Sequence, residues 1–360
     1  MKKKVLVGMS GGVDSSVSAG LLIQQGYDVV GGFIKNWSNT KDVLTGECEW
    51  KKERRDALRV ASFLGIPLLT FDFEDRYREL VVNELYKGYE EGRTPNPDVL
   101  CNEYIKFGLF WDKAQDLGFD SIATGHYARV KQLKNKEAEL WRGKDKNKDQ
   151  SYFLYRVKQS VLRETFFPVG NFNKQRIRKI AKEWNLPVAS KPDSQGICFI
   201  GKVNFSEFLR GKVKGAPGNI VNDKGVVLGR HEGLYNYTIG QRQRIKIPGS
   251  HPWYVAQKDM EHNVLVVVDS LDHPFLQIKK IFLDDMHWIS GKSEKDDLSV
   301  DLQVRYRQEP LKARLSTDKQ GKWFLIAKKV IPWATIGQSA VIYKGDKCLG
   351  GGVIRKVEHL

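Results

Sequence analysis

The stretch Ser-Gly-Gly-Val-Asp-Ser-Ser at residues 10–16 follows an apolar run at residues 5–8. Residues 17–25, which come next, have apolar side chains at helical spacing. This order predicts a strand, a glycine-rich loop and a helix. Two adjacent glycines let the backbone approach a ligand that a Cβ would obstruct, and the N–H groups at a helix start attract an anion. We therefore predict that residues 10–16 form a phosphate-binding loop.

Asp14 is unusual in such a loop because a carboxylate repels phosphates unless a cation lies between them. We therefore predict that Asp14 binds Mg²⁺. No lysine follows the glycines, which argues against the loop of GTPases and kinases. The run instead resembles the pyrophosphatase loop of the N-type ATP pyrophosphatases, which split ATP into AMP and pyrophosphate while adenylating an oxygen. A Gly-Gly turn capped by Ser and Asp at an ordinary helix start is the alternative.

The composition points to a polyanionic partner. The 360 residues include 59 Lys and Arg against 43 Asp and Glu, a formal net charge of +16, and such an excess suits nucleic acid. Surface lysines that only keep the chain soluble are the alternative. The sequence has no run of eighteen apolar residues, and Met-Lys-Lys-Lys leads directly into the first strand. We therefore expect a cytoplasmic protein that does not enter a membrane, and we expect a monomer.

The pattern of strands and helices changes along the chain. Over the first 130 residues, strands at 27–34, 66–71 and 121–124 alternate with helices at 51–64, 74–90 and 104–117, which predicts an α/β domain with a mostly parallel sheet. Beyond residue 203, short strands such as 219–221 and 264–268 predict a small β-rich domain. Strands at 298–306, 322–327 and 339–343 then predict a small barrel or sandwich. The predicted domains are 1–203, 204–272 and 273–360.

Two cysteines lie in segments with distinctive sequences. The four cysteines are far apart and form no Cys-x-x-Cys pair, so neither a disulfide framework nor a zinc ribbon is indicated. Two prolines in segment 94–102 bar regular structure and hold Asp98 and Cys101 in a set relation. If Cys101 opens the next helix, the helix terminus lowers the pKa of its thiol and favours a nucleophile. An inert buried cysteine is the alternative, there and at Cys198.

Further candidates lie at strand ends and in basic segments. Gly125 and His126 follow a strand at the edge where ligands bind, and His126 either touches a substrate or is structural. The charged loop that ends at residues 148–150 suits contacts with phosphates and base edges. The helix at 173–184 carries five basic residues, mostly as a solvated face that suits an RNA backbone. Tyr306 between two arginines suits RNA bases and phosphates.

Together these motifs resemble the tRNA-specific 2-thiouridylases over essentially the whole chain. The resemblance implies an adenine nucleotide alpha hydrolase-like first domain and a C-terminal β-barrel that contacts tRNA. It implies ATP binding by Gly8, Met9, Ser10, Gly11, Gly12, Val13, Asp14, Ser15, Ile34 and Gly125, although position 34 is often Met in the family. It implies target-base contact by Asn96, Pro97 and Asp98, and tRNA contact by His126, Lys148, Asp149, Gln150, Arg305, Tyr306 and Gln338.

The resemblance also implies a mechanism. ATP adenylates the C2 oxygen of the wobble uridine in the anticodon, and pyrophosphate leaves. A separate sulfur-donor protein charges Cys198 as a persulfide, and Cys101 either frees hydrosulfide from it or cleaves the linkage that forms after direct attack on C2. Both routes end with a Cys101–Cys198 disulfide. Asp98 is the candidate general acid/base, and the base must leave its stack, which is cheapest in a single-stranded loop.

Two other functions fit parts of the sequence. A ligase that adenylates a small substrate uses the same loop, but it would not need two reactive cysteines. An RNA-binding module with a vestigial nucleotide site would account for the charge, but the intact loop argues against it. Pyrophosphate release that depends on tRNA would exclude this second alternative.

Overall fold

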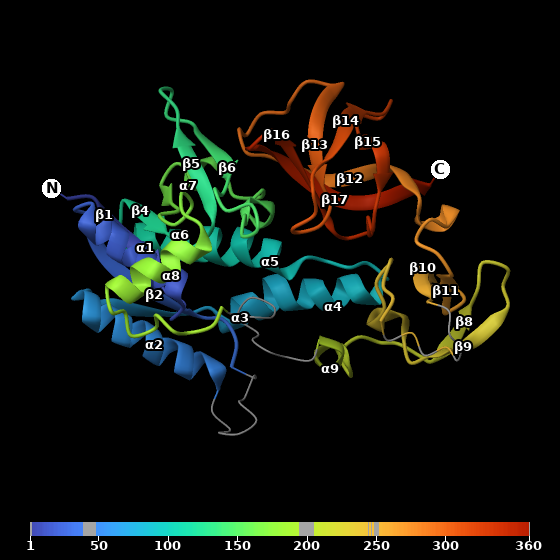
Figure 1. The fold of residues 1–360 in the computed structure, drawn as a ribbon, viewed down its shortest axis with the longest axis horizontal. Coiled ribbons are helices and arrows are strands. Elements are labelled where there is room, and N and C mark those ends of the chain that lie inside the picture. Colours follow the sequence, from blue (N-terminus) through green and yellow to red (C-terminus); the bar gives the residue numbers. More distant parts are fainter. Residues whose placement is uncertain are drawn as a thin grey trace.

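A computed structural model describes residues 2–38, 48–193, 205–243, 245, 247 and 252–359, with no side-chain description at 205 and 206. Its first domain contains a parallel sheet in the order β3-β2-β1-β4-β7 (Figure 1). The strands are β1 (Lys4–Gly8), β2 (Asp28–Lys35), β3 (Leu68–Asp72), β4 (Ser121–Ala123) and β7 (Thr165–Phe166). The predicted α/β class is confirmed.

Helices cover both faces of this sheet because successive strand residues point in opposite directions. Val5 packs on one face with Leu22 of α1 (Val13–Gln24) and Val60 of α2 (Glu49–Leu64). Leu6 packs on the other face with Phe110 of α6 (Phe110–Asp116). Each such buried apolar side chain contributes about 1.5–3 kcal/mol. α8 (Lys174–Glu183) packs against α1, which places it beside the glycine-rich loop.

Two long helical segments each contain a π-helical part. The first is α3 (Glu74–Tyr77), η1 (Arg78–Val82) and α4 (Asn83–Glu90). The second is α5 (Pro97–Leu100), η2 (Cys101–Leu109) and α6. The prediction of irregular structure through residues 94–102 was wrong from Pro97 onward. Proline is favoured at the first position of a helix, and the Asn96 side chain caps this helix by accepting from the N–H groups of Asp98 and Val99.

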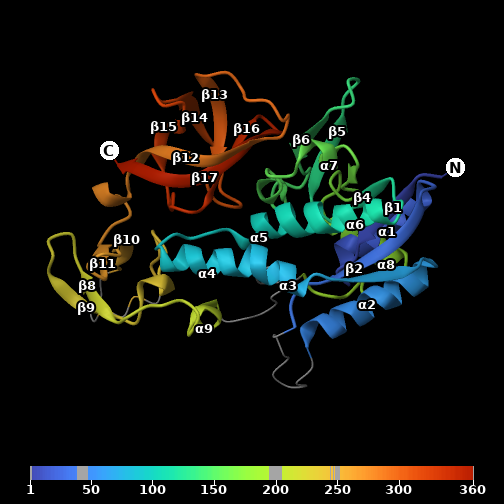
Figure 2. The ribbon, with the colours of Figure 1, turned by 180° about the vertical axis from the view of Figure 1, so that it is seen from behind.

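The C-terminal part forms a closed six-stranded barrel (Figure 2). The strands run in the order β12-β15-β14-β13-β16-β17, and β12 pairs with β17 to close it. They are β12 (Ile278–Trp288), β13 (Leu298–Gln303), β14 (Leu311–Thr317), β15 (Trp323–Ile331), β16 (Ser339–Lys344) and β17 (Lys347–His359). Alternating buried residues such as Val300 and Leu302 fill the interior.

A hairpin of the first domain extends the barrel sheet. It consists of β5 (Ala128–Gln132) and β6 (Ala138–Arg142), and β6 pairs with β17 at Leu140 and Cys348. This hairpin was not predicted from the sequence. The pairing joins the barrel sheet to the first domain, and the hairpin lies beside the barrel in both views of the ribbon (Figures 1 and 2).

The intervening part carries a four-stranded sheet in the order β10-β11-β8-β9, near the end of α4 (Figure 1). Its strands are β8 (Gly218–Val221), β9 (Val227–His231), β10 (Tyr254–Asp259) and β11 (Val264–Val268). Short helices complete the chain: η3 (Ser151–Phe153), α7 (Gln159–Leu162), α9 (Phe205–Leu209), η4 (Leu234–Asn236) and η5 (Pro274–Leu276). We retain 1–203, 204–272 and 273–360 as proposed domain limits. In the described ranges, no helix has both the length and the apolar character needed to cross a membrane.

Candidate nucleotide and tRNA site

The glycine-rich loop connects β1 to the first turn of α1. Gly11 has a φ of +70°, which disfavours a side chain, and Gly12 is the N-cap of α1. The Ser15 hydroxyl donates to the Gly12 carbonyl at 3.2 Å and accepts from the Ser10 N–H at 3.3 Å. The Ser16 hydroxyl also donates to Gly12, at 2.7 Å. These bonds hold the loop closed on itself, with the start of α1 open to an anion.

Backbone atoms of α2 and of the segment after β4 lie in close contact with this loop. A Cβ added at Gly11 would lie 2.4 Å from the backbone oxygen of Glu53 in α2. A Cβ added at Gly125, just after β4, would lie 2.7 Å from the Ser15 nitrogen. Both glycines therefore permit close backbone approach. The structure brings Gly125 to the loop, as its predicted role in ATP binding requires.

Asp14 is held from two sides. The Tyr127 hydroxyl donates to Asp14 Oδ1 at 2.8 Å, and Lys174 Nζ lies 2.7 and 2.8 Å from the two carboxylate oxygens. The Asp14 side chain is 31% exposed. In the described part of the chain, no three His, Cys, Asp or Glu side chains gather to hold a metal ion. One carboxylate together with phosphate oxygens is, however, a usual donor set for Mg²⁺, so Asp14 fits the predicted role.

Asp193 collects three cations beside the loop. Its carboxylate accepts from Lys148 Nζ at 2.7 Å, Lys174 Nζ at 2.8 Å and Arg178 Nη2 at 2.5 Å. Burial raises the pKa of Asp193, but the hydrogen bonds from Lys148 and Lys174 outweigh burial and hold this pKa well below its ordinary value. The carboxylate is therefore ionised at neutral pH. Lys174 links it directly to Asp14.

A second charged cluster lies against the other side of the loop. Lys191 Nζ donates to the Gly11 carbonyl at 3.0 Å and to Asp56 Oδ2 at 2.7 Å. Burial raises the pKa of the nearby Glu53 to about 7, although the charge of Lys191 opposes the rise. Lys191 thus ties the segment that leads toward Cys198 to the backbone of the loop.

Of the two predicted catalytic cysteines, Cys101 lies within the described residues. Cys101 lies five residues beyond the N-cap Asn96, one turn after Asp98, and its side chain is fully buried. Cys101 does not open the helix, and the helix-terminus effect on which we based its low pKa fades beyond the first turn. Cys198 lies outside the described residues. The i, i+3 spacing does place Asp98 and Cys101 on one helix face.

His126 is a buried residue of the first domain. Its Nδ1 lies 2.7 Å from the Thr124 hydroxyl, and its ring packs between Phe107 and Phe167, each at 5.9 Å. Burial lowers the pKa of His126 well below its ordinary value, and the charge of Lys106 lowers it further. The imidazole is therefore neutral at pH 7, so a contact with RNA would use hydrogen bonding rather than charge.

The three residues of the run at 148–150 contact different parts of the first domain. The Lys148 side chain is 30% exposed, and its Nζ reaches Asp193. Asp149 is buried, and its carboxylate accepts from Arg142 Nη1, the Gly143 N–H and Ser151. Gln150 exchanges two hydrogen bonds, each 2.9 Å, with the backbone of Tyr127. The geometry therefore favours a positioning role for Asp149.

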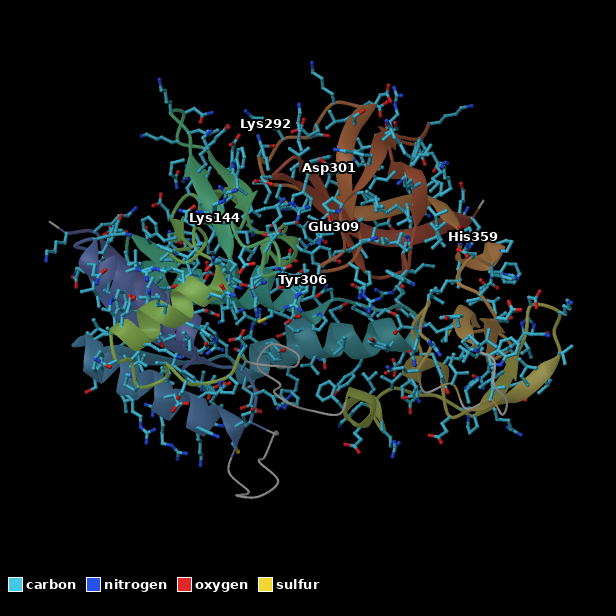
Figure 3. All side chains as sticks on the ribbon, in the orientation of Figure 1. Lys144, Lys292, Asp301, Tyr306, Glu309 and His359 are labelled. Atoms are coloured by element: carbon cyan, nitrogen blue, oxygen red, sulfur yellow. The ribbon has the colours of Figure 1, made fainter. Side chains whose placement is uncertain are left out.

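The barrel places two predicted tRNA contacts, Gln338 and Tyr306, near the start of the second helical segment. Gln338 Nε2 donates to the Thr94 carbonyl at 2.8 Å. Tyr306 packs on Phe153 at 4.5 Å between ring centroids, and Figure 3 shows it at the junction of the barrel and the first domain. The Phe153 carbonyl accepts from Asn102, next to Cys101. Residues far apart in the sequence thus meet at one junction.

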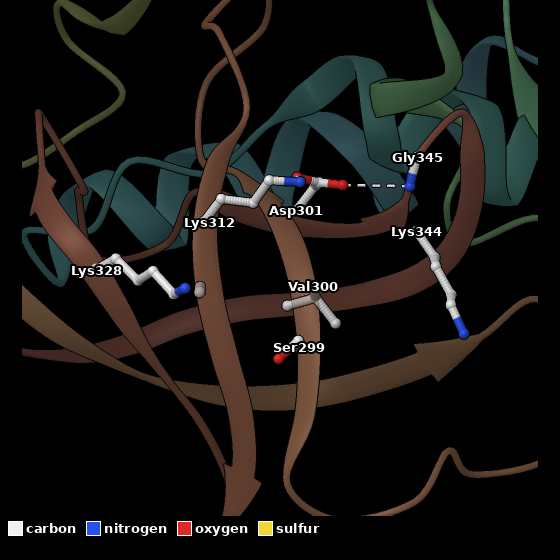
Figure 4. Close-up of a pocket in the computed structure, with 8 residues that line it drawn as sticks. Ser299, Val300, Asp301, Lys312, Lys328, Lys344 and Gly345 are labelled. Atoms are coloured by element: carbon white, nitrogen blue, oxygen red, sulfur yellow. Dashed lines mark hydrogen bonds and ion pairs between the residues drawn. The ribbon is translucent and has the colours of Figure 1, made fainter.

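A pocket lies on the barrel (Figure 4). Asp301 accepts there from Lys312 Nζ at 2.6 Å and from the Gly345 N–H at 3.2 Å. Its lining residues are Ser299, Val300, Asp301, Lys312, Ala313, Lys328, Lys344 and Gly345, none of which the sequence singled out.

Several residues at the loop were not predicted from the sequence, Tyr127, Lys174 and Asp193 above all. The basic helix at 173–184 was expected to be mainly a solvated face. Lys174 and Arg178 instead point inward, with 12% and 31% of their side chains exposed, whereas Lys179 is 70% exposed. The i, i+4 spacing of Lys174 and Arg178, which places both on one helix face, was the one sequence feature that could have indicated their shared inward contacts.

Comparisons with known proteins cover the whole chain. Family models match residues 3–202 ("tRNA methyl transferase HUP domain"), 206–269 ("tRNA methyl transferase PRC-barrel domain") and 278–354 ("Aminomethyltransferase beta-barrel domain"). A solved 4-thiouridine synthetase–RNA complex with bound ATP is 18% identical over 59% of this chain and 50% of that chain, with a TM-score of 0.36, a likeness too distant to carry weight.

Full-length relatives are much closer. "tRNA-specific 2-thiouridylase MnmA" of Methylobacillus flagellatus is 47% identical over 98% of this chain and 99% of its own length. The proteins of the same name from Janthinobacterium sp. (strain Marseille) and Shouchella clausii are 45% and 44% identical, over 98% and 100% of this chain and 98% and 99% of their own lengths. The chain therefore belongs to the family of tRNA-specific 2-thiouridylases, a family of enzymes.

Proposed function

We propose that this chain uses ATP to replace the C2 oxygen of the wobble uridine in tRNA with sulfur. The observation that carries the proposal is the junction of the barrel with the second helical segment. Gln338 of the barrel donates to the Thr94 carbonyl just before Asn96, and Tyr306 of the barrel packs on Phe153, whose carbonyl accepts from Asn102 beside Cys101. This helical segment belongs to the same domain as the glycine-rich loop. Membership in the 2-thiouridylase family supports the same function.

ATP would bind at the glycine-rich loop. The N–H groups at the start of α1 would hold its phosphates, and Gly125 would let the backbone after β4 approach the nucleotide. Ile34 is buried in the same apolar cluster as Phe110 and offers an apolar surface to adenine. Mg²⁺ would shield the phosphate charge from Asp14 when it is bound. The phosphates and Asp14 would then lie side by side without repulsion.

The target base would lie against Asn96, Pro97 and Asp98. Asp98 would move the proton that accompanies activation of the pyrimidine, because it stands in the first turn of the helix and one turn before Cys101. The C2 oxygen would attack the α-phosphorus of ATP, and pyrophosphate would leave with the bonding electrons. Neutral His126 and cationic Lys148 and Arg305 would contact tRNA.

Sulfur would then displace AMP from C2. Cys198 would carry a persulfide received from a separate sulfur-donor protein. Cys101 would either attack this persulfide to free hydrosulfide or cleave the linkage after the persulfide has attacked C2. Either route leaves a Cys101–Cys198 disulfide that needs a reductant. The buried position of Cys101 protects its thiol from solvent oxidants. The protein would act as a monomer in the cytoplasm.

Mass spectrometry of tRNA nucleosides tests the proposal. The full chain is incubated with tRNA, ATP, Mg²⁺ and a sulfide source, and we expect a uridine at the wobble position in which sulfur replaces oxygen. The matched control is tRNA with cytidine at that position, which should stay unmodified. Formation of AMP and pyrophosphate with tRNA but without any thiolated uridine would refute thiolation and leave a tRNA-adenylating ligase.

Two cysteine variants test the sulfur steps. Cys198→Ser should accept no sulfur from a persulfide donor protein, whereas Cys101→Ser should accept sulfur and fail to complete a turnover. Cys348→Ser is the control, because Cys348 is buried in β17 and burial raises the pKa of its thiol to about 12. The assignment fails if Cys348→Ser loses activity while Cys198→Ser retains it.

A further inference from the structure

The glycine-rich loop has no lysine of its own, yet it must hold a triphosphate. Phosphate-binding loops of the Gly-x-x-x-x-Gly-Lys type provide that charge within the loop. Two lysines from elsewhere reach this loop, Lys191 and Lys174. Lys191 is bound to the Gly11 carbonyl and to Asp56 at the side of the loop that faces α2. Lys174 instead reaches the Asp14 carboxylate in the first turn of α1.

Lys174 is fixed at both ends. It is the first residue of α8, and its backbone N–H donates to Asp145 Oδ2 at 2.9 Å. Its Nζ lies within 2.8 Å of three carboxylate oxygens, two of Asp14 and one of Asp193. An ammonium has three N–H donors, so anionic oxygens occupy all three. Phosphate oxygens are the same kind of acceptor and can replace them.

A cluster of ionised side chains surrounds Lys174. It contains the cations Lys148, Lys174 and Arg178 and the carboxylates Asp14 and Asp193. Asp145, which accepts from the Lys174 backbone N–H, adds a third carboxylate, so the cluster has no net charge. It stands at the N-terminus of α1, where the helix dipole favours an anion. Lys174 is its most buried cation, with 12% of its side chain exposed, so solvent screens its charge least.

We propose that Lys174 is a catalytic residue that binds the pyrophosphate portion of ATP. The inference rests on the proposed function and adds a residue to it. As the oxygen nucleophile bonds to the α-phosphorus, the bond from that phosphorus to the bridging oxygen breaks and its electron pair passes to pyrophosphate. The ammonium of Lys174 neutralises this growing charge and keeps its proton. Asp14 and Asp193 hold Nζ beside the first turn of α1 before ATP binds, and phosphate oxygens then replace one or more of these carboxylate contacts.

Binding of inorganic pyrophosphate tests this role without tRNA or sulfur. We expect Lys174→Met to weaken pyrophosphate binding to the full chain by about tenfold or more, measured by calorimetry, since one charge-assisted hydrogen-bonding group is lost. Lys174→Arg should retain most of the affinity. Lys179→Met is the matched control on the same helix, because Lys179 is 70% exposed, and it should bind like the wild type. AMP binding should be unchanged in all three variants.

A structural role for Lys174 is tested separately. Lys174→Met leaves Asp14 and Asp193 without their shared cation, and the variant could fail to fold. A second comparison therefore uses Asp14→Asn as the reference and the double variant Asp14→Asn, Lys174→Met as the test. Both proteins lack the Asp14 carboxylate, so the loss of Lys174 does not leave that carboxylate unpaired. The double variant should bind pyrophosphate about tenfold more weakly than Asp14→Asn alone.

Pyrophosphate affinity within twofold of the reference in both comparisons would overturn the proposal. Equal losses of pyrophosphate and AMP binding would also overturn it, because they would indicate a collapsed loop. Failure of the thiolation assay with intact, Lys174-dependent pyrophosphate binding would instead refute only the proposed reaction. The two hypotheses therefore fail in distinguishable ways.

Discussion

The half-buried carboxyl group of Glu53 makes the stability of the first domain depend on pH. Glu53 lies in α2, and its backbone oxygen lies against Gly11 of the loop. Burial is the largest cause that raises the pKa of Glu53 from 4.5 to about 7, and the charges of Glu49 and Asp56 add to it while Lys191 opposes it. The folded chain therefore holds the proton more tightly than the unfolded chain does.

The sign follows from this difference. Below pH 4.5 the carboxyl is protonated in both the folded and the unfolded chain and does not change the free energy of unfolding. As the pH rises from 4.5 to about 7, the carboxyl ionises first in the unfolded chain, so the free energy of unfolding falls. At about 1.4 kcal/mol per pH unit, the loss reaches at most about 3 kcal/mol and is constant above pH 7. Glu53→Gln cannot ionise, so it removes this loss.

Denaturant unfolding of both proteins at pH 5 and pH 8 measures the effect. The free energy of unfolding of Glu53→Gln relative to wild type should be higher at pH 8 than at pH 5, by about 2–3 kcal/mol. Comparing the two pH values cancels any pH-independent effect of the amide. Glu79→Gln is the control, because the Glu79 side chain is 58% exposed. Parallel pH profiles for wild type and Glu53→Gln would refute the assignment of a half-buried, protonated Glu53.

Other predictions concern the loop and the charge of the chain. Gly11→Ala should abolish measurable ATP binding in calorimetry, because its Cβ would lie 2.4 Å from the Glu53 oxygen at a φ of +70°, whereas Gly26→Ala, at a φ of +87° with open space, should cost only about 1–2 kcal/mol of stability. Gly125→Ala should weaken ATP binding without weakening tRNA binding in a filter assay, because its Cβ would lie 2.7 Å from the Ser15 nitrogen. Affinity for tRNA should fall with salt with a log–log slope of several units, and a flat dependence would mean that the net charge of +16 serves another purpose.

Local patterns in the sequence were sufficient for the loop and for four of the five strands of the first sheet, all but the two-residue β7. Strand and helix periodicities extend over a few residues, and the glycine-rich loop is contiguous, so its position between β1 and α1 follows from residues 5–25 alone. The same locality explains the error at Pro97. Two prolines indicate a break in structure, but whether a break ends a loop or begins a helix depends on the cap, which Asn96 provides.

Contacts between distant segments could not be read in the same way. Lys174 lies 160 positions from Asp14, and a basic helix gives no sign of which lysines face inward. The β5–β6 hairpin pairs with β17 of the barrel, although their paired residues Leu140 and Cys348 belong to different predicted domains. Only the tertiary structure brings such partners together, because side-chain charge and strand propensity do not specify a partner.

The run at 148–153 connects the glycine-rich loop to the barrel. Gln150 is bonded to the backbone of Tyr127, whose hydroxyl donates to Asp14 in the loop. The Tyr152 hydroxyl donates toward the Val304 and Ser339 carbonyls of the barrel, at 3.2 and 2.9 Å.

Asp149, between these residues, accepts from Arg142, which also donates to Gln303 at the end of β13. Buried hydrogen bonds of this kind are costly to break singly, because the remaining partner stays buried and unsatisfied. A short segment that resembles a charged tRNA contact in the sequence therefore also connects the glycine-rich loop to the barrel.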